Sequence, residues 1–309
     1  MQRPGKWRWA LAIVASLVAT AGGAHAAATT WVPEELGAAE ATAAPALQAG
    51  EARVVTLNAW RLATNARVPG YVGAVDAIAA ELGQGGGSHP EMLSIQEIQS
   101  REVLAELEQR FAGEGTHFAS CVCSVRADGS VREAVVGVTA PPVIARSSEC
   151  IDLGAMFPDH ERCAVLIRGE LGGRPVDFVS THLAWHVENS PMVERLMGEL
   201  SARGALGPGT VIAGDFNAWP GSTAHEAMIA GALRDARPGA GRTHSIGGRI
   251  DYVLLGEGLD VVRAIDRRSS YEAVQPTAAL ALPDACATEG PPACPVSDHL
   301  PEAVVVRAR

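Results

Sequence analysis

Lysine is almost absent from this chain of 309 residues, in which Lys6 is the only one. Lys6 lies in a segment that we expect to be removed on export, so the mature chain has no lysine for a Schiff base, for pyridoxal phosphate or for a phosphate-binding P-loop. The sequence also lacks the GxSxG, HExxH and GxGxxG motifs. Serine esterases, zinc proteases and dinucleotide-binding enzymes therefore have no support.

Positive charge is also scarce. The chain has 25 Lys and Arg residues against 35 Asp and Glu residues, a net charge of −10. An acidic chain does not gather polyanions through its overall charge, which argues against an architectural nucleic-acid binder. An enzyme acting on a phosphate ester would have to attract it locally. With 47% hydrophobic and 19% charged residues, the composition is that of an ordinary globular protein.

The N-terminus has the pattern of a secretory signal. An apolar segment, Ala10–Ala24, is followed by the small-x-small sequence AHA that ends at Ala26, and its length is short for a membrane span of ~20 residues. We expect a signal peptide over residues 1–26 and a secreted or periplasmic protein, with an uncleaved membrane anchor as the alternative. The mature chain would then carry 22 basic and 35 acidic residues, a net charge of −13. The cations of the signal are Arg3, Lys6 and Arg8.

An even number of cysteines in an exported protein favours disulfides. Cys286 and Cys294 flank a short Pro/Ala/Gly loop, and we expect them to pair and to hold the loop that follows, which carries Asp298 and His299. A zinc site is the alternative to disulfides, but a CxC sequence at Cys121 and Cys123 with the remaining cysteines scattered is poor zinc spacing. The other four are expected to form two disulfides, in which Cys121 and Cys123 pair with Cys150 and Cys163 in an order that the sequence leaves open.

Strand and helix patterns are mixed along the chain after an Ala-rich leader, residues 27–51, that we expect to be loosely ordered. This mixture predicts one α/β domain over residues 52–309. The predicted strands are Arg53–Asn58, Met92–Gln96, Ala134–Val138, Ala164–Arg168, Val176–Ser180, Val211–Ala213, Asp251–Leu255 and Ala303–Arg307, and the predicted helices are Gly70–Leu82, Arg101–Phe111, Val193–Ala202 and Ala224–Ala232.

Polar residues stand next to the ends of these apolar strands. In α/β proteins strand ends are where ligands bind, and charge there is costly unless it is paired or on a metal. Each residue alone is weak evidence for a ligand site, and the inference depends on the whole set. Its members are Asn58 after VVTL, Glu97 after MLSIQ, His182 after VDFVST, Asp215 and Asn217 after VIAG, Asp251 in RIDYVLL, and Asp298 and His299 before LPEAVVV.

The series LNAW, QEI, STHL, GDFNAWPGS, RIDYV and SDH resembles the endonuclease/exonuclease/phosphatase superfamily of DNase I-like hydrolases, from about Val54 to Val306. The resemblance implies an α/β fold in the form of a four-layer sandwich, two packed mixed β-sheets with helices on the outer faces. It also implies metal-dependent hydrolysis of phosphoester bonds. The implied ion is Mg²⁺, with Mn²⁺ or Ca²⁺ as substitutes.

Roles follow residue by residue from the same resemblance. Glu97, with Asn58 beside it, resembles the Mg²⁺ site, and few protein ligands suffice because Mg²⁺ keeps several waters. Asp298 would be a further carboxylate near the metal or the phosphate. His299 resembles the general base, and Asp251 the carboxylate that holds its imidazole.

The substrate side is implied in the same way. Asp215 and Asn217 would position the attacking water and a phosphate oxygen, and His182 would bind the phosphate or protonate the leaving oxygen. Arg162 and Thr243 resemble phosphate contacts of the family less closely. A bidentate guanidinium would supply the local positive charge that an acidic protein needs.

One family feature is missing. Many members have a phosphate-contacting tyrosine between the Glu and His motifs, and the interval from Glu97 to His182 contains no tyrosine. His117, Phe118 and Arg132 are candidate replacements. The substrate class therefore stays open at this position.

Several substrates fit the resemblance. DNA or RNA is the first expectation, which makes a secreted nuclease, and the LNAW sequence also resembles bacterial sphingomyelinases that act on a phospholipid headgroup. Other phosphate esters remain, and so does a catalytically inactive binding module. No strongly apolar hairpin indicates membrane insertion, and we expect a monomer. The mature chain has four tryptophans, Trp31, Trp60, Trp185 and Trp219. The last three follow Asn58, His182 and Asn217 by two or three residues, and they either pack at strand ends or form an aromatic rim around the cleft.

Overall fold

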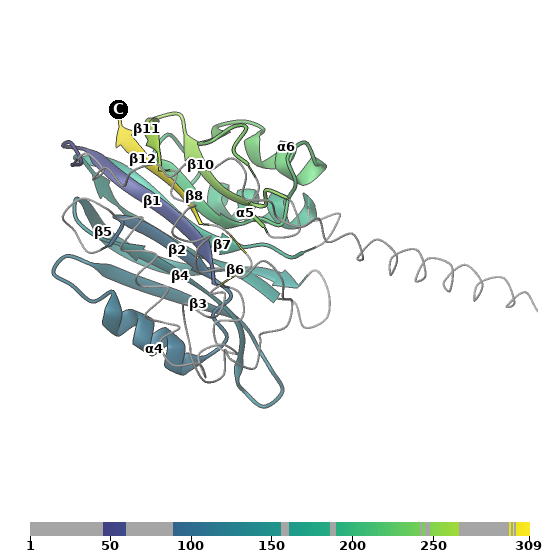
Figure 1. Cartoon of the computed structure of the whole chain (residues 1–309). Coiled ribbons are helices and arrows are strands. Elements are labelled where there is room, and N and C mark those ends of the chain that lie inside the picture. Colours follow the sequence, from purple (N-terminus) through teal and green to yellow (C-terminus); the bar gives the residue numbers. More distant parts are fainter. Residues whose placement is uncertain are drawn as a thin grey trace, which may run out of the picture. The chain divides into compact units, whose positions relative to one another are not determined.

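Two six-stranded β-sheets form the centre of the structure (Figure 1). All described residues belong to one unit, Glu40–Arg309. The computed structural model describes residues 46–59, 89–155, 161–185, 190–241, 243–244, 248–265, 297, 299 and 301–309.

The first sheet has the strand order β11-β12-β1-β2-β4-β3. Its central strand β1 is buried at every residue, as expected for a strand covered on both faces. β1 pairs in parallel with β2 and antiparallel with β12. The strands are β1 (Glu51–Asn58), β2 (Met92–Gln96), β3 (His117–Val125), β4 (Val131–Thr139), β11 (Leu259–Ala264) and β12 (Glu302–Ala308).

The second sheet has the order β5-β6-β7-β8-β10-β9. β7 and β8 are parallel, and β10 is antiparallel to β8. β7 and β8 approach closely at Gly214, where a Cβ atom would lie 2.0 Å from the carbonyl oxygen of Thr181, so only glycine fits. The strands are β5 (Val143–Ala155), β6 (Glu161–Leu171), β7 (Arg174–His182), β8 (Thr210–Asp215), β9 (Leu233–Asp235) and β10 (Asp251–Gly256).

Helices cover the outer faces of the two sheets. α4 (Arg101–Arg110) packs on the first sheet through Val103, Leu104 and Leu107, and its N-cap Ser100 accepts hydrogen bonds from two backbone amides. α5 (Ser190–Ala202) and α6 (Thr223–Ile229) pack on the second sheet. A third apolar cluster joins residues of both sheets and fills the space between them. The result is the predicted four-layer α/β sandwich.

The predicted elements that are described were found, and most strands are longer than predicted. The helix predicted over Ala224–Ala232 is too long, because the chain leaves helical geometry at Ala230 and Gly231 has a φ of 100°. β3, β5, β9 and β11 were not predicted. The helix predicted over Gly70–Leu82 lies outside the described residues.

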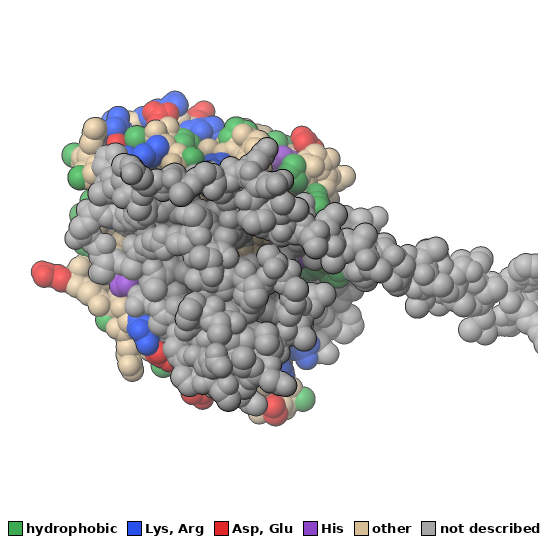
Figure 2. Space-filling view, in the orientation of Figure 1, with side chains coloured by type: hydrophobic (Ala, Val, Ile, Leu, Met, Phe, Trp, Pro, Cys, Tyr) green, Lys and Arg blue, Asp and Glu red, His purple; other side chains and the backbone are tan. Residues whose placement is uncertain are grey.

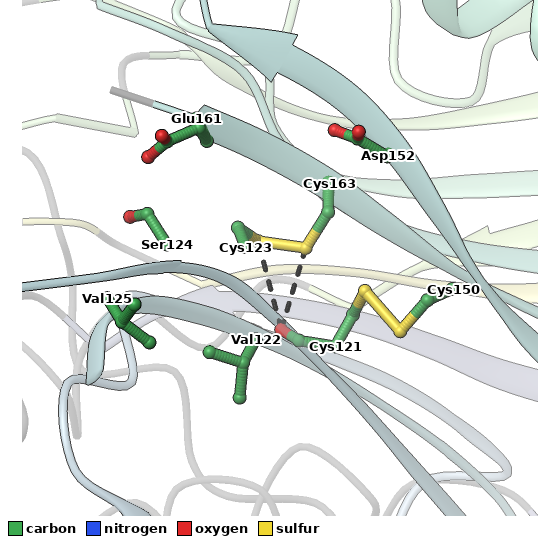
Figure 3. Close-up of a pocket in the computed structure, with 9 residues that line it drawn as sticks. All are labelled: Cys121, Val122, Cys123, Ser124, Val125, Cys150, Asp152, Glu161 and Cys163. Carbon is green, nitrogen blue, oxygen red and sulfur yellow. Dashed lines mark hydrogen bonds between the residues drawn. A yellow bond between two sulfur atoms is a disulfide. The ribbon is translucent and has the colours of Figure 1, made fainter. Parts of the chain in front are cut away.

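Two disulfides link β3, the edge strand of the first sheet, to β5 and β6 of the second sheet. Cys121 pairs with Cys150 and Cys123 with Cys163, which confirms the predicted partners and resolves their order. Both line a cavity of about 450 Å³ that Asp152 also lines (Figure 3). Both bonds therefore connect the first sheet to the second. Cys286 and Cys294 lie outside the described residues.

The described surface carries charge of both signs. On the face drawn in Figure 2, acidic and basic side chains are interspersed along the upper rim. Among the described residues, no helix combines the length and the apolar character that crossing a membrane requires.

Candidate active site

Strand pairing brings the predicted residues to the same end of the two sheets. Asn58 is the last residue of β1, and His182 and Asp215 are the last residues of the parallel strands β7 and β8, where they are register partners. Asp251 begins the antiparallel strand β10 directly opposite Asp215. The carboxyl ends of the parallel strands therefore lie together at this end of the sheets, and the side chains that they carry there are buried.

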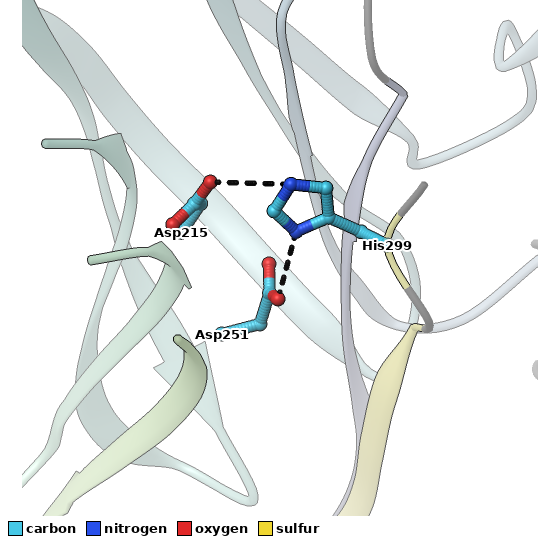
Figure 4. Close-up of side chains that lie close together, drawn as sticks. All are labelled: Asp215, Asp251 and His299. Carbon is cyan, nitrogen blue, oxygen red and sulfur yellow. Dashed lines mark hydrogen bonds and ion pairs between the residues drawn. The ribbon is translucent and has the colours of Figure 1, made fainter. Parts of the chain in front are cut away.

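His299 lies between two carboxylates (Figure 4). Its Nδ1 is 2.9 Å from Oδ2 of Asp251, and its Nε2 is 3.7 Å from Oδ2 of Asp215, beyond direct hydrogen-bond distance. The hydroxyl of Ser297 accepts a hydrogen bond from the backbone amide of His299 and donates to the carbonyl of Asn58. The imidazole is thus held at Nδ1 and turns Nε2 toward the centre of the site.

His182 forms a second pair of the same kind. Its Nδ1 is 2.8 Å from Oε1 of Glu133, which comes from β4 of the opposite sheet. Its Nε2 is 3.2 Å from Nδ2 of Asn217 and 3.5 Å from Oδ2 of Asp215. Arg162, on β6, lies 3.9 Å from the other oxygen of Glu133. The two histidines therefore present their Nε2 atoms to the same carboxylate.

Asn58, on the first sheet, is hydrogen-bonded to Asp215 on the second sheet. Its Nδ2 donates to Oε1 of Glu97 at 3.2 Å and to Oδ2 of Asp215 at 2.9 Å. The backbone amide of Asn217 donates to the second oxygen of Asp215 at 2.8 Å. Asp215 is therefore fixed by both of its oxygens.

Backbone strain marks the same place. Among the described residues other than glycine, only Glu97 and Asn217 have positive φ angles, of 63° and 50°. This conformation costs free energy for a side chain with a Cβ atom, and such residues cluster at functional sites. Both residues were candidates from the sequence.

Burial and charge shift two pKa values in the site. Burial, and then the nearby Arg162 guanidinium, lower the pKa of His182 to about 4. His182 is therefore neutral near pH 7, with Nδ1–H donating to Glu133 and Nε2 accepting from Asn217. Burial and the negative charge of Asp251 raise the pKa of Asp215 to about 6.

The residues present fit a hard divalent cation. Glu97 and Asn58 offer the oxygen donors that Mg²⁺ prefers, and Glu97 is only partly buried. Ligand atoms of Asp215, Asp251 and His299 also lie within 4.8 Å of one another. Asp251 Oδ1 is buried and has no hydrogen-bond partner among the described residues, an arrangement that a cation or a water would complete.

A phosphate group has a matching donor. Arg162 is 9% exposed, and its Nε has no hydrogen-bond partner among the described residues. A buried guanidinium with an unused N–H is costly unless an anion completes its contacts.

The remaining candidates divide as follows. Thr243 is buried, and its Oγ1 accepts hydrogen bonds from the backbone amides of Ile250 and Asp251, so it holds the strand start that carries Asp251. Its contact with phosphate stays a prediction. Asp298 lies outside the described residues. The other eight predicted site residues form one connected network, which Arg162 joins through Glu133.

Of the three replacements considered for the missing tyrosine, only Arg132 lies at the site's end of its sheet. His117 pairs with Thr139 and Phe118 with Val138, at the opposite end of β4. Arg132 directly precedes Glu133.

Glu133 is the functional candidate that the sequence analysis missed. It is buried in β4, just before the apolar run that predicted this strand. A charged residue at the border of a strand that is otherwise buried was the available signal.

Known proteins share this fold. The human nocturnin catalytic domain with a bound sulfate anion is 14% identical, with a TM-score of 0.62, and the match covers 84% of this chain and 94% of that domain. An endonuclease/exonuclease/phosphatase from Bacteroides vulgatus is 15% identical, with a TM-score of 0.60 and coverage of 84% and 99%.

A third solved structure is ANGEL2, a 2′,3′-cyclic phosphatase in complex with adenosine-2′,3′-vanadate, at 12% identity and a TM-score of 0.60, with coverage of 84% and 96%. At these identities the likeness shows the fold alone. No curated protein sequence matches the chain.

The family itself is established by sequence. The model of the Endonuclease/Exonuclease/phosphatase family matches residues 55–299, which span the strand-end residues from Asn58 to His299. Members of this family are metal-dependent hydrolases of phosphoester bonds. The chain therefore belongs to the Endonuclease/Exonuclease/phosphatase family and is a metal-dependent phosphoester hydrolase.

Proposed function

We propose that this protein is an exported, Mg²⁺-dependent phosphodiesterase that cleaves nucleic acid. The observation that carries the proposal is the pairing of His299 with Asp251, which leaves Nε2 directed at Asp215, while the buried Arg162 lies against the neighbouring His182–Glu133 pair. This arrangement suits a water-activating base next to an anion site.

The chain's own residues divide the work. Asp215 orients the attacking water, and His299 accepts its proton at Nε2 while Asp251 holds Nδ1 and favours the charged imidazolium. Arg162 donates to the phosphoryl oxygens, and Asn217 and His182 bind at the phosphate. In the neutral imidazole the single N–H is bound to Glu133, so His182 must take up a proton at Nε2 before it can donate to a phosphate oxygen or to the leaving oxygen.

Glu97 and Asn58 are the residues that would hold Mg²⁺, and the family resemblance implies Asp298 as a further carboxylate for the metal or the phosphate. When bound, Mg²⁺ supplies Lewis-acid stabilisation of charge on the phosphoryl oxygens. Water is the nucleophile in this scheme, and no covalent intermediate with the enzyme is needed.

Export is supported by the signal-like N-terminus and by the two disulfides, which form and persist in oxidising compartments. Nucleic acid as substrate is supported by the adenosine derivative bound to ANGEL2. The sphingomyelinase-like alternative rests on the LNAW resemblance alone.

The test uses residues 27–309 with the disulfides formed, incubated with supercoiled plasmid and Mg²⁺. We expect nicking that EDTA abolishes and that the His299→Ala variant lacks. An intact plasmid after incubation with folded wild-type protein would contradict the nuclease proposal, and sphingomyelin and small phosphate esters would then be tried.

A further inference from the structure

Two exposed tryptophans flank the site. Trp185 is 72% exposed and follows His182 by three residues, and Trp219 is 46% exposed and follows Asn217 by two. Tryptophan offers a large rigid ring, and exposed ones are frequent where ligands are bound. The remaining exposed large hydrophobics among the described residues are Val125, Ile144 and Val262, on β3, β5 and β11.

The two tryptophans come from neighbouring loops. His182 and Asp215 are register partners at the ends of β7 and β8, so the following segments start side by side. The backbone amide of Leu183 donates to the carbonyl of Asp215 at 2.9 Å, and Nδ2 of Asn217 donates to the carbonyl of Leu183 at 3.0 Å. These bonds tie both loops to residues of the site.

The ring of Trp219 packs against the backbone at Gly248. A Cβ atom at Gly248 would lie 2.3 Å from Cζ3 of Trp219, so the indole packs directly against this glycine. Nearly half of Trp219 nevertheless stays exposed. A ring that is fixed on one part and open on another is suited to stacking with a flat partner.

We propose that Trp185 and Trp219 bind a nucleobase of the substrate by stacking, beside the phosphate that is cleaved. The proposal rests on the proposed nuclease function and adds a contact that holds the nucleoside. A base is favoured over a lipid surface because the other exposed hydrophobics lie on other elements, so that no broad apolar patch surrounds the rings among the described residues. Base stacking also requires no positive charge, and the chain has fewer basic than acidic residues.

The test compares two chromogenic esters that release the same p-nitrophenol, the p-nitrophenyl ester of thymidine 5′-phosphate and methyl p-nitrophenyl phosphate. Only the first has a base. The proteins are wild type, Trp185→Ala, Trp219→Ala and the two Trp→Phe variants. Ile144→Ala is a matched control, because it removes an exposed hydrophobic side chain at 52% exposure from another strand.

We expect each Trp→Ala change to lower the ratio of kcat/KM between the two esters by about tenfold, mainly through KM, in line with the usual effect of losing one base-stacking ring. Phenylalanine should keep most of the ratio, and Ile144→Ala should leave both rates unchanged. Quenching of tryptophan fluorescence by oligothymidylate in the His299→Ala background should weaken in parallel.

Two results would overturn the proposal in different ways. If the tryptophan variants lower kcat/KM for the two esters by the same factor, or leave both values unchanged, the base-stacking proposal is wrong while the hydrolase function stands. If wild type cleaves the methyl ester but neither the thymidine ester nor plasmid, the nuclease function fails and base stacking fails with it.

Discussion

The two ends of the central sheets bury charge in different ways, and strand β1 reaches both. Near its start Arg53 is paired with Glu91, with the backbone amide and Nε of Arg53 each 2.8 Å from one carboxylate oxygen and the guanidinium also bound to the other. At its far end Asn58 lies among Glu97, Asp215 and the two histidine–carboxylate pairs.

The two ends differ in whether the buried charges are paired within the protein. Arg53 and Glu91 neutralise each other within the protein. At the other end, several carboxylates converge on two histidines and one arginine, and Asp251 Oδ1 and Arg162 Nε have no hydrogen-bond partner among the described residues. A matched buried pair indicates structure, and an unmatched cluster indicates that ligands complete it.

The largest expected effect is at the site. His299→Ala should lower kcat/KM by about 10²–10⁴-fold, the usual contribution of a general base. The free energy of unfolding should also fall, because Asp251 stays buried without its partner at His299 Nδ1, and the folded fraction should still lack activity. Steady-state hydrolysis and urea denaturation check the two halves of this prediction, and an active variant would refute the assignment of the base.

A variant at the opposite end should lose stability but not activity. Arg53→Met leaves Glu91 buried without its partner and should lower the free energy of unfolding by about 3–5 kcal/mol. The folded fraction should keep its kcat. The Arg53→Met, Glu91→Leu double variant is the control, and we expect it to recover much of the loss. A stability loss below about 1 kcal/mol would mean that this pair is not the structural element we describe.

A smaller effect is expected at the second histidine pair. Glu133→Gln removes the charge that orients His182 and should lower kcat/KM on the order of 10–100-fold, as for other carboxylates that orient a functional histidine. Glu170→Gln, in an exposed ion pair with Arg146, is the matched control and should have no effect. If Glu133→Gln reduces stability but not turnover, the role of Glu133 is structural only.

The smallest effect is expected at Thr243. Thr243→Val removes the oxygen that accepts from the amides of Ile250 and Asp251 and should lower the free energy of unfolding by about 1–3 kcal/mol, while Thr243→Ser should not. A raised KM without loss of stability would instead favour the phosphate contact that the resemblance implies.

Patterned, buried elements could be predicted from the sequence. β2 was predicted residue for residue, because a short apolar run between polar segments marks a buried strand. β5 was missed because only Val143, Ile151 and Leu153 of its thirteen residues are buried, so an edge strand left no hydrophobic pattern.

The site was predictable for a different reason. Residues such as Asp215 and His182 stand at strand ends in recognisable local sequences, and strand pairing then brings them together. Glu133 could not be placed, because its partner His182 is 49 residues away and on the other sheet. Only packing of the two sheets creates that contact.

The most direct test of this account is calorimetric titration of Mg²⁺ into wild type, Glu97→Gln and the surface control Glu170→Gln, with the disulfides intact. We expect wild type and Glu170→Gln to bind Mg²⁺ equally, and Glu97→Gln to bind it at least about tenfold more weakly. Equal binding by all three proteins would contradict the claim that the unmatched end of the sheets is completed by a cation held at Glu97.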